Sequence, residues 1–245
     1  MKIVAVIPAR MGSSRFPGKP LAPILGRPMI QWVYEGSLGC PRLSGVYIAT
    51  CDVEIRDAAR SFGAPVVMTS ERHERASDRV AEVAEHLDAD IVVMVQGDEP
   101  MVVPEMVTLA TEPFATPGVL CTNLASVIES EEEFHDPNTI KVVFNQKGEA
   151  LYFSREPVPT CTRGKFRAGV AYRQVCVIGF RRQFLLRYTT LEPTDYEKLE
   201  SIDMLRILEH GYPVHIVRTS HRSHPVDTES DLKGVERLLV EAKSR

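Results

Sequence analysis

Residues 3–21 have the sequence IVAVIPARMGSSRFPGKPL. The first five of them are continuously apolar and mostly β-branched, which is typical of a strand buried on both faces of a parallel sheet. The next fourteen are rich in glycine, proline and serine, and they carry three cations, Arg10, Arg15 and Lys19. The stretch therefore predicts a buried strand that leads directly into a cationic loop.

Strand and helix patterns alternate beyond this loop for about eighty residues. Short apolar runs predict strands at 46–50, 65–68 and 91–95, and apolar residues at helical spacing predict helices at 28–34, 54–62 and 77–86. This alternation favours an α/β fold with a three-layer, mostly parallel, Rossmann-like sheet. Ligands of such sheets bind outside the carboxyl ends of the strands, where the loops after Ile7 and Val95 lie.

The second half of the chain is less regular. The segments 140–144 and 150–153 predict a hairpin around a polar turn, and 174–180 and 214–217 predict two further strands. We expect a loop at 157–169 and helices at 196–210 and 228–243, the last beginning with a capping box of Thr228 and Asp231. We treat residues 1–245 as a single domain.

The composition excludes several classes of protein. Of 245 residues, 44% are hydrophobic and 25% are charged, as in ordinary globular proteins. The net charge of −4 provides no basic field for nucleic acid or an anionic membrane surface. No apolar stretch approaches the roughly 20 residues of a membrane helix. The five cysteines include no Cys-x-x-Cys pair, which indicates reduced thiols and a cytoplasmic protein.

The cationic loop has the chemistry of a triphosphate site. Glycine and serine allow backbone amides to approach phosphate oxygens, arginine supplies forked hydrogen bonds, and lysine supplies a movable charge. The alternative is a surface turn with solvated charges. Neither the P-loop pattern nor the glycine fingerprint of dinucleotide-binding folds occurs, which disfavours a P-loop ATPase and a dehydrogenase.

Three motifs together resemble a known family. They are Pro-Ala-Arg-x-x-Ser-x-Arg-x-Pro-Gly-Lys-Pro-Leu at 8–21, Gln-Gly-Asp-Glu-Pro at 96–100 and Leu-Tyr-Phe-Ser-Arg at 151–155. The chain is similar to the 3-deoxy-manno-octulosonate (Kdo) cytidylyltransferase family of sugar nucleotidyltransferases. The resemblance implies CMP transfer from CTP to the anomeric hydroxyl of a 3-deoxy-2-ulosonic acid, with Kdo as the expected acceptor and pyrophosphate as the second product.

The resemblance also implies the site residues on the nucleotide side. Asp98 and Asp227 would hold Mg²⁺, although Asp98 alone fits a turn residue and Asp227 alone fits a helix N-cap. The catalytic set is Arg10, Lys19, Asp98 and Asp227. The nucleotide-binding set is Pro8, Ala9, Arg10, Gly12, Ser13, Arg15, Lys19, Ser77, Arg79, Gln96 and Asp98.

The implied sugar-binding set departs from the family pattern at several positions. The set is Arg79, Arg155, Gln174, Ile178, Asp203 and Met204. Gln174 replaces a histidine, Ile178 a tyrosine and Met204 a glutamine, while Asp203 is one methylene shorter than the usual glutamate. Polar partners of this kind decide which acceptor is accepted. An 8-amino analogue of Kdo, a sialic-acid-like sugar, a phosphonate, or nucleotide binding without catalysis therefore remain alternatives.

The family resemblance divides the chain into two parts. Residues 1–130 would bind the nucleotide, and 131–245 would bind the acceptor and form a homodimer through a small irregular β-containing lobe. Partners are then CTP and an acidic sugar, with neither nucleic acid nor a membrane.

Overall fold

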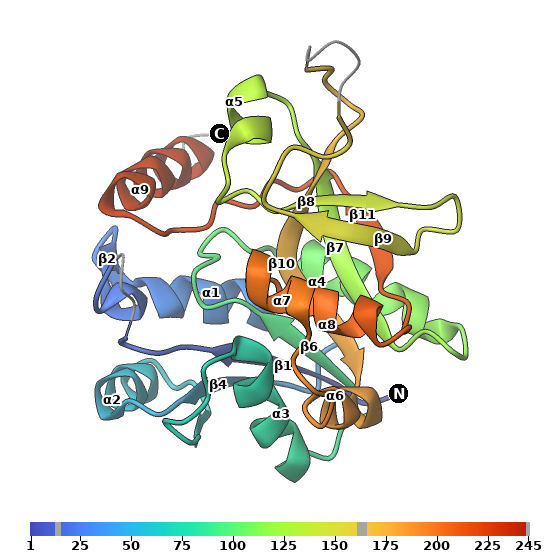
Figure 1. The fold of residues 1–245 in the computed structure, drawn as a ribbon. Coiled ribbons are helices and arrows are strands. Elements are labelled where there is room, and N and C mark those ends of the chain that lie inside the picture. Colours follow the sequence, from blue (N-terminus) through green and yellow to red (C-terminus); the bar gives the residue numbers. More distant parts are fainter. Residues whose placement is uncertain (13–15, 161–165, 244–245) are drawn as a thin grey trace.

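The computed structural model describes residues 1–12, 16–160 and 166–243. A nine-stranded sheet forms the centre of the molecule, with the strands of its main path in the order β11-β7-β10-β6-β1-β4-β5 (Figure 1). The strands of this sheet are β1 (Ile3–Pro8), β4 (Gly45–Thr50), β5 (Val66–Met68), β6 (Ile91–Val95), β7 (Cys121–Val127), β8 (Lys141–Phe144), β9 (Ala150–Ser154), β10 (Tyr172–Arg181) and β11 (His215–Thr219). A small separate pair consists of β2 (Pro23–Ile24) and β3 (Arg27–Pro28).

Helices cover both faces of this sheet (Figure 1). The helices are α1 (Met29–Leu38), α2 (Val53–Ser61), α3 (Ala76–His86), α4 (Pro104–Thr111), α5 (Glu131–His135), α6 (Arg182–Tyr188), α7 (Asp195–Glu200), α8 (Asp203–Glu209) and α9 (Glu229–Lys243). Two 3-10 turns are η1 (Lys19–Leu21) and η2 (Glu112–Ala115).

The opening strand lies in the middle of the parallel part of the sheet. β1 pairs in parallel with β4 on one side and with β6 on the other, and β4 pairs in parallel with β5. β10 runs antiparallel to both β6 and β7, and β7 pairs in parallel with β11. The predicted three-layer, mostly parallel sheet is therefore confirmed, with one reversed strand inside it.

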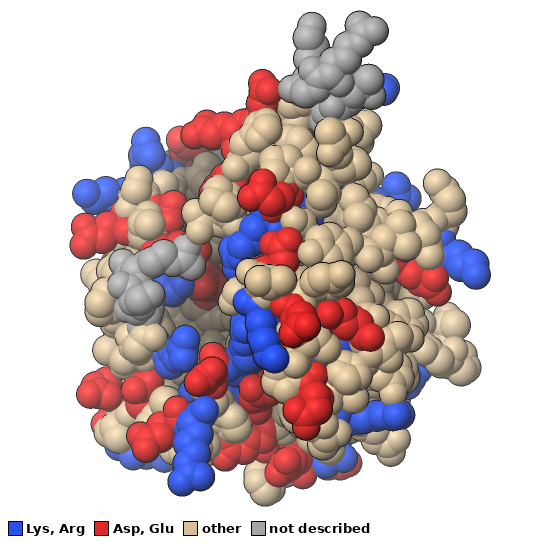
Figure 2. Space-filling model, viewed as in Figure 1, with Lys and Arg blue, Asp and Glu red and all other residues tan. Residues whose placement is uncertain are grey.

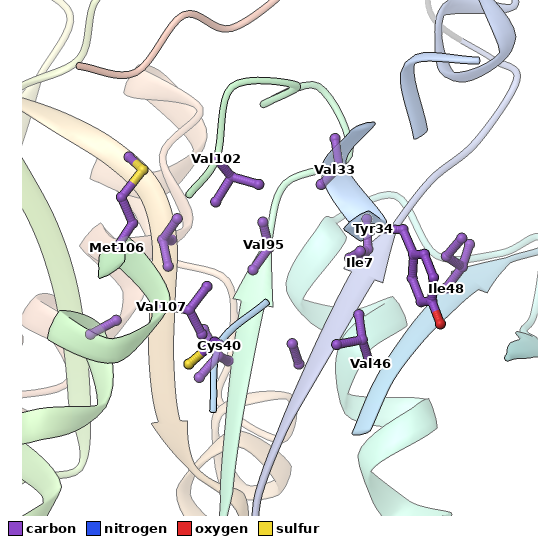
Figure 3. Close-up of a cluster of buried hydrophobic side chains, with 14 of the residues drawn as sticks. Ile7, Val33, Tyr34, Cys40, Val46, Ile48, Val95, Val102, Met106 and Val107 are labelled. Carbon is purple, nitrogen blue, oxygen red and sulfur yellow. The ribbon is translucent and has the colours of Figure 1, made fainter. Parts of the chain in front are cut away.

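Alternating residues of β1 point into two separate cores, as the period of two in a strand requires. Ile3, Ala5 and Ile7 pack against side chains of α1, α2 and α4. Figure 3 shows part of this cluster, in which Ile7 lies near Val33 of α1. Val4 and Val6 face the other core, with side chains from α3, α6 and α8. Both faces of the strand are covered, which explains its continuous apolar sequence.

Several elements of the second half differ from the sequence-based prediction. The single helix expected at 196–210 is two helices, α7 and α8, because Ser201 adopts a left-handed conformation with φ of +54°. The helices α4, α5 and α6 and the strand β7 were not predicted at all. The hairpin at 140–154 is confirmed as β8 and β9. Within the described residues, no helix is long and apolar enough to cross a membrane.

Candidate active site

Two loops meet at the carboxyl ends of neighbouring strands. The first leaves β1 at Pro8 and the second leaves β6 at Gln96, and the two strands pair in parallel. A Cβ atom on Gly97 would lie 2.7 Å from the carbonyl oxygen of Pro8, so the two backbones approach more closely than any side chain allows. Gly97 thus permits the contact between the cationic loop and the acidic loop.

Replacing Gly97 by alanine should lower the free energy of unfolding by about 1–3 kcal/mol, since the Pro8 carbonyl is backbone and has to move. Chemical denaturation would measure the change. The matched control is Gly234→Ala in α9, where the added Cβ meets nothing within 4 Å. Equal stability of the two variants would contradict a forced close approach at Gly97.

The described part of the cationic loop is fixed by three backbone interactions. The Ala9 amide donates to the Ala49 carbonyl at 2.9 Å, and the Met11 amide donates to Oδ2 of Asp52 at 2.8 Å. The Gly18 amide donates to the Met11 carbonyl at 3.1 Å. These bonds bring the two ends of the loop together and place Lys19 at the start of η1, beside the sheet edge. Ser13 and Arg15 lie outside the described residues.

Lys19 bridges the two predicted metal carboxylates. Its Nζ lies 2.7 Å from Oδ2 of Asp98 and 3.2 Å from Oδ1 of Asp227. The side chain of Lys19 is 12% exposed, and those of Asp98 and Asp227 are 28% and 26% exposed. Residues separated by up to 208 positions thus meet in one partly buried cluster, as the family resemblance implied.

The charge of this lysine is stabilised by its neighbours. Burial alone would lower the pKa of Lys19, but the carboxylates of Asp98 and Asp227 outweigh it and raise that pKa above its ordinary value. The ammonium therefore stays protonated throughout the physiological pH range. A folded-state pKa above the unfolded one means that this contribution to stability is complete at neutral pH and is lost only at strongly alkaline pH.

Thr228, and not Asp227, caps α9. The hydroxyl of Thr228 accepts from the Asp231 amide at 3.2 Å, and Oδ2 of Asp231 accepts from the Thr228 amide at 2.8 Å, which confirms the predicted capping box. The Asp227 carboxylate is left to face Lys19. The Val226 amide donates to the Asp98 carbonyl at 2.9 Å and so joins the two acidic loops.

Lys19, Asp98 and Asp227 line a cavity of about 410 Å³. Figure 2 shows a hollow on this face of the molecule that is bordered by Lys and Arg side chains. Nine predicted site residues line the cavity: Pro8, Ala9, Arg10, Gly12, Lys19, Arg79, Gln96, Asp98 and Asp227. Six further residues complete the lining: Pro20, His73, Glu74, Arg75, Ala76 and Gly97. None of these six was among the predicted site residues.

Arg79 is more rigid than a surface arginine. Only 3% of it is exposed, and its guanidinium donates to the hydroxyl of Thr69 and to the Ser70 carbonyl. His73 is held beside it, with Nε2 at 2.6 Å from Oε2 of Glu82. These hydrogen bonds hold both side chains of this wall of the cavity in place.

Six predicted residues lie outside the lining of this cavity. Ser77 is fully buried and donates to Oδ2 of Asp203 at 2.7 Å. Gln174 is buried and donates to Oδ1 of Asn123 at 2.5 Å. Ile178 and Met204 belong to the core between the sheet and α3.

Arg155 is the sixth, and its guanidinium is bound to main-chain oxygens. Its Nε donates to the Glu200 carbonyl at 2.6 Å, and one terminal nitrogen donates to the Pro137 carbonyl at 2.9 Å. Asp203, which accepts from Ser77, also lies 3.4 Å from a terminal nitrogen of Arg75. Burial raises the pKa of Asp203. Arg75 lines the cavity and contacts Asp203, so it connects the buried Asp203 to the cavity wall.

A buried carboxylate lies directly behind the acidic cluster. Glu99 is 2% exposed and contacts the hydroxyl of Ser223, which is 4% exposed. Burial and the neighbouring charge of Asp98 raise the pKa of Glu99 to about 7. Sequence reasoning missed this pair, because nothing in the spacing of 99 and 223 indicates that they meet.

The fold and the site together define a nucleotidyltransferase: a cationic loop and a pair of carboxylates meet at the carboxyl edge of a parallel α/β sheet. The cytidylyltransferase family model matches residues 4–220. The chain belongs to this family, and in particular to the 3-deoxy-manno-octulosonate cytidylyltransferases.

The relatives are similar over the whole chain. The 3-deoxy-manno-octulosonate cytidylyltransferase of Geobacter metallireducens is 46% identical over 250 residues, with 97% of this chain and 98% of that protein covered. The protein of the same name from Acaryochloris marina is 41% identical over 237 residues, with 95% of each chain covered.

Solved structures agree with this assignment. The structure of CMP:2-keto-3-deoxy-manno-octonic acid synthetase complexed with CTP has a TM-score of 0.91 and 38% identity, and it covers 99% of this chain and 100% of its own. A cytidylyltransferase from Leptospira borgpetersenii has a TM-score of 0.63 at 16% identity, covers 96% of this chain and 85% of its own, and supports the fold alone.

Proposed function

We propose that this protein transfers CMP from CTP to the anomeric hydroxyl of Kdo and releases pyrophosphate. The observation that carries the proposal is the Lys19 ammonium between Asp98 and Asp227, in a cavity also lined by Pro8, Ala9, Arg10 and Gly12 of the cationic loop. The full-length relatives and the CTP-complexed synthetase support CTP as the nucleotide and Kdo as the acceptor.

We propose Mg²⁺ as the cofactor, with Asp98 and Asp227 as its ligands. The two carboxylates already share one cation, the ammonium of Lys19, so they can face a common positive charge. Carboxylate oxygens suit Mg²⁺, which usually takes one or two carboxylates and leaves its other positions to phosphate oxygens and water.

The chemistry is a displacement at the α-phosphorus. A bond forms between the sugar hydroxyl oxygen and that phosphorus, while the bond to the pyrophosphate oxygen breaks. When bound, Mg²⁺ supplies charge neutralisation at the phosphate and lowers the pKa of the attacking hydroxyl. Lys19 and Arg10 stabilise the negative charge of the triphosphate and of the leaving group, because phosphoryl transfer depends mainly on positioning and charge. Gln96 and the Pro8–Ala9 backbone orient the nucleotide.

Three further features belong to this proposal. We expect a cytoplasmic enzyme that activates a sugar for lipopolysaccharide or capsule synthesis. We expect a homodimer that forms through the lobe containing β8 and β9, which branch from the main path of the sheet at β10 (Figure 1). Sedimentation would show a species of twice 27.4 kDa, and a monomer at working concentrations would contradict the dimer.

An acceptor screen tests the function. Purified protein with CTP and Mg²⁺ should release pyrophosphate with Kdo as acceptor, and ATP, GTP and UTP should be much poorer donors. The 8-amino analogue of Kdo, sialic acids and phosphonates are the parallel arms, because Gln174, Ile178 and Met204 depart from the family pattern. Faster turnover of one of these would replace Kdo as the acceptor, and CTP binding without product from any acid would overturn the enzymatic proposal.

A further inference from the structure

The residue after Asp98 points in the opposite direction. The Asp98 side chain is 28% exposed toward the cavity, whereas Glu99 is only 2% exposed. The turn between them is fixed by the Glu99 amide, which donates to the Gln96 carbonyl at 3.2 Å. A carboxylate buried this deeply requires a hydrogen-bond partner, since its transfer from water is otherwise costly.

One such partner is the backbone of Cys176, and another is Ser223, which lies 124 residues further along the chain than Glu99. Its hydroxyl lies 2.5 and 2.6 Å from the two carboxylate oxygens of Glu99. Ser223 is itself only 4% exposed, so water does not compete for this contact. Hydrogen bonds in the interior, where water does not screen them, are stronger than the same bonds at the surface.

The contact stabilises a segment with no regular structure of its own. Residues 220–228 lie between the end of β11 and the start of α9, outside the main sheet ladder. This segment contains Asp227, and two interactions join it to the β6 loop. One is Ser223 to Glu99, and the other is the Val226 amide to the Asp98 carbonyl at 2.9 Å.

We propose that Glu99 and Ser223 are positioning residues that set the separation of Asp98 and Asp227 for the cation they share. Neither side chain is among the residues that line the cavity in the described part of the chain. Glu99 therefore acts through Asp98, and Ser223 acts through the segment that contains Asp227. The proposal rests on the Mg²⁺ site of the proposed function and adds to it the residues that hold the site together. Partners behind a metal ligand commonly change metal affinity by about 10–100-fold when they are replaced.

A variant pair separates this role from ordinary buried packing. Ser223→Ala removes the hydroxyl next to the carboxylate. Ser126→Ala is the control, because Ser126 is also 3% exposed, but its hydroxyl is buried with no partner in the described part of the chain. Ser223→Thr keeps a hydroxyl, and Glu99→Gln keeps an oxygen that accepts from it.

The measurement is the affinity for CTP by calorimetry without acceptor, in the presence and absence of Mg²⁺. The dissociation constant without Mg²⁺ divided by that with Mg²⁺ reports the contribution of the metal site without any turnover. We expect Ser223→Ala to reduce this ratio about 10-fold or more. Ser126→Ala should leave the ratio unchanged, and Ser223→Thr and Glu99→Gln should each retain most of it. Without Mg²⁺, all five proteins should bind CTP with similar affinity.

The outcomes distinguish the proposed metal site from the proposed positioning role. If the wild type gains nothing from Mg²⁺, the proposed metal site fails. If the wild type gains but Ser223→Ala gains equally, the positioning role alone is overturned. Should Ser223→Ala prove unfolded by circular dichroism, Ser223→Cys, which replaces the hydroxyl by a weak donor, decides the matter: a Mg²⁺ ratio equal to that of the wild type in a folded protein would also overturn the role.

Discussion

Replacing Lys19 by alanine should lower kcat by about 10²–10³-fold and leave a folded protein, the usual cost of removing one preorganised charge that stabilises a transition state. Lys19 is the cation that contacts both Asp98 and Asp227, and burial limits the access of water that would otherwise screen it. A steady-state assay of pyrophosphate release with CTP and Kdo would measure the loss.

The control for this prediction is Lys147→Ala. Lys147 is exposed in the turn between β8 and β9, and it does not line the cavity. Its removal should leave turnover unchanged. Normal turnover of Lys19→Ala would refute the role assigned to the lysine, and so would an equal loss in both variants.

Replacing Arg206 by methionine should lower the free energy of unfolding by about 3–5 kcal/mol, the typical cost of leaving one member of a buried ion pair alone. Arg206 makes a two-pronged contact with Glu197, at 2.7 Å from Nε to Oε2 and 2.6 Å from the terminal nitrogen to Oε1. The side chains are only 6% and 1% exposed. The guanidinium also lies over the ring of Tyr188, with 4.7 Å to its centroid.

Urea denaturation followed by circular dichroism would measure this change. The matched variant is Lys2→Met, which breaks the surface pair of Lys2 with Asp88, whose side chains are 49% and 94% exposed. Exposed pairs contribute about 0–1 kcal/mol, so this variant should unfold almost as the wild type does. Similar losses in the two variants would show that burial is not what makes the Arg206 pair important.

The parallel half of the fold was readily predictable from sequence. β1, β4, β5 and β6 are short and apolar and are bounded by turn residues, so local composition suffices to identify them. β7 was missed because its sequence, CTNLASV, mixes polar and apolar residues although six of its seven residues are buried. The buried side-chain amide of Asn123 donates to the Val175 and Leu124 carbonyls, which no local pattern reveals.

The split between α7 and α8 was also beyond local reasoning. Residues 196–210 read as one amphipathic helix, and Ser201 is an unusual residue for a left-handed position. The break allows Arg206 of α8 to turn back onto Glu197 of α7. The driving force is therefore a contact between the two halves and not a signal at the break.

Some of the candidate site could also be predicted from the local sequence, and some could not. The meeting of the loops after β1 and β6 was predictable because both loops follow their strands directly, so the strand ends place them. Asp227 was placed by family resemblance alone, since its position depends on the contacts of Ser223 and Val226 with the β6 loop. The acceptor-binding residues stay a prediction. Ile178 and Met204 are core residues, and their positions depend on packing that the local sequence does not reveal.

The reversed strand β10 has a consequence for how the chain reaches its native state. β6 ends at residue 95 and β7 at residue 127, yet the strand that lies between them does not begin until residue 172. A nascent chain that has just left the ribosome up to β7 therefore carries two open strand edges, which are prone to pair with other molecules. Sheet closure joins residues far apart in sequence, and such closures are slow. Truncation before β10 should consequently yield an aggregating fragment and not a free-standing nucleotide-binding unit.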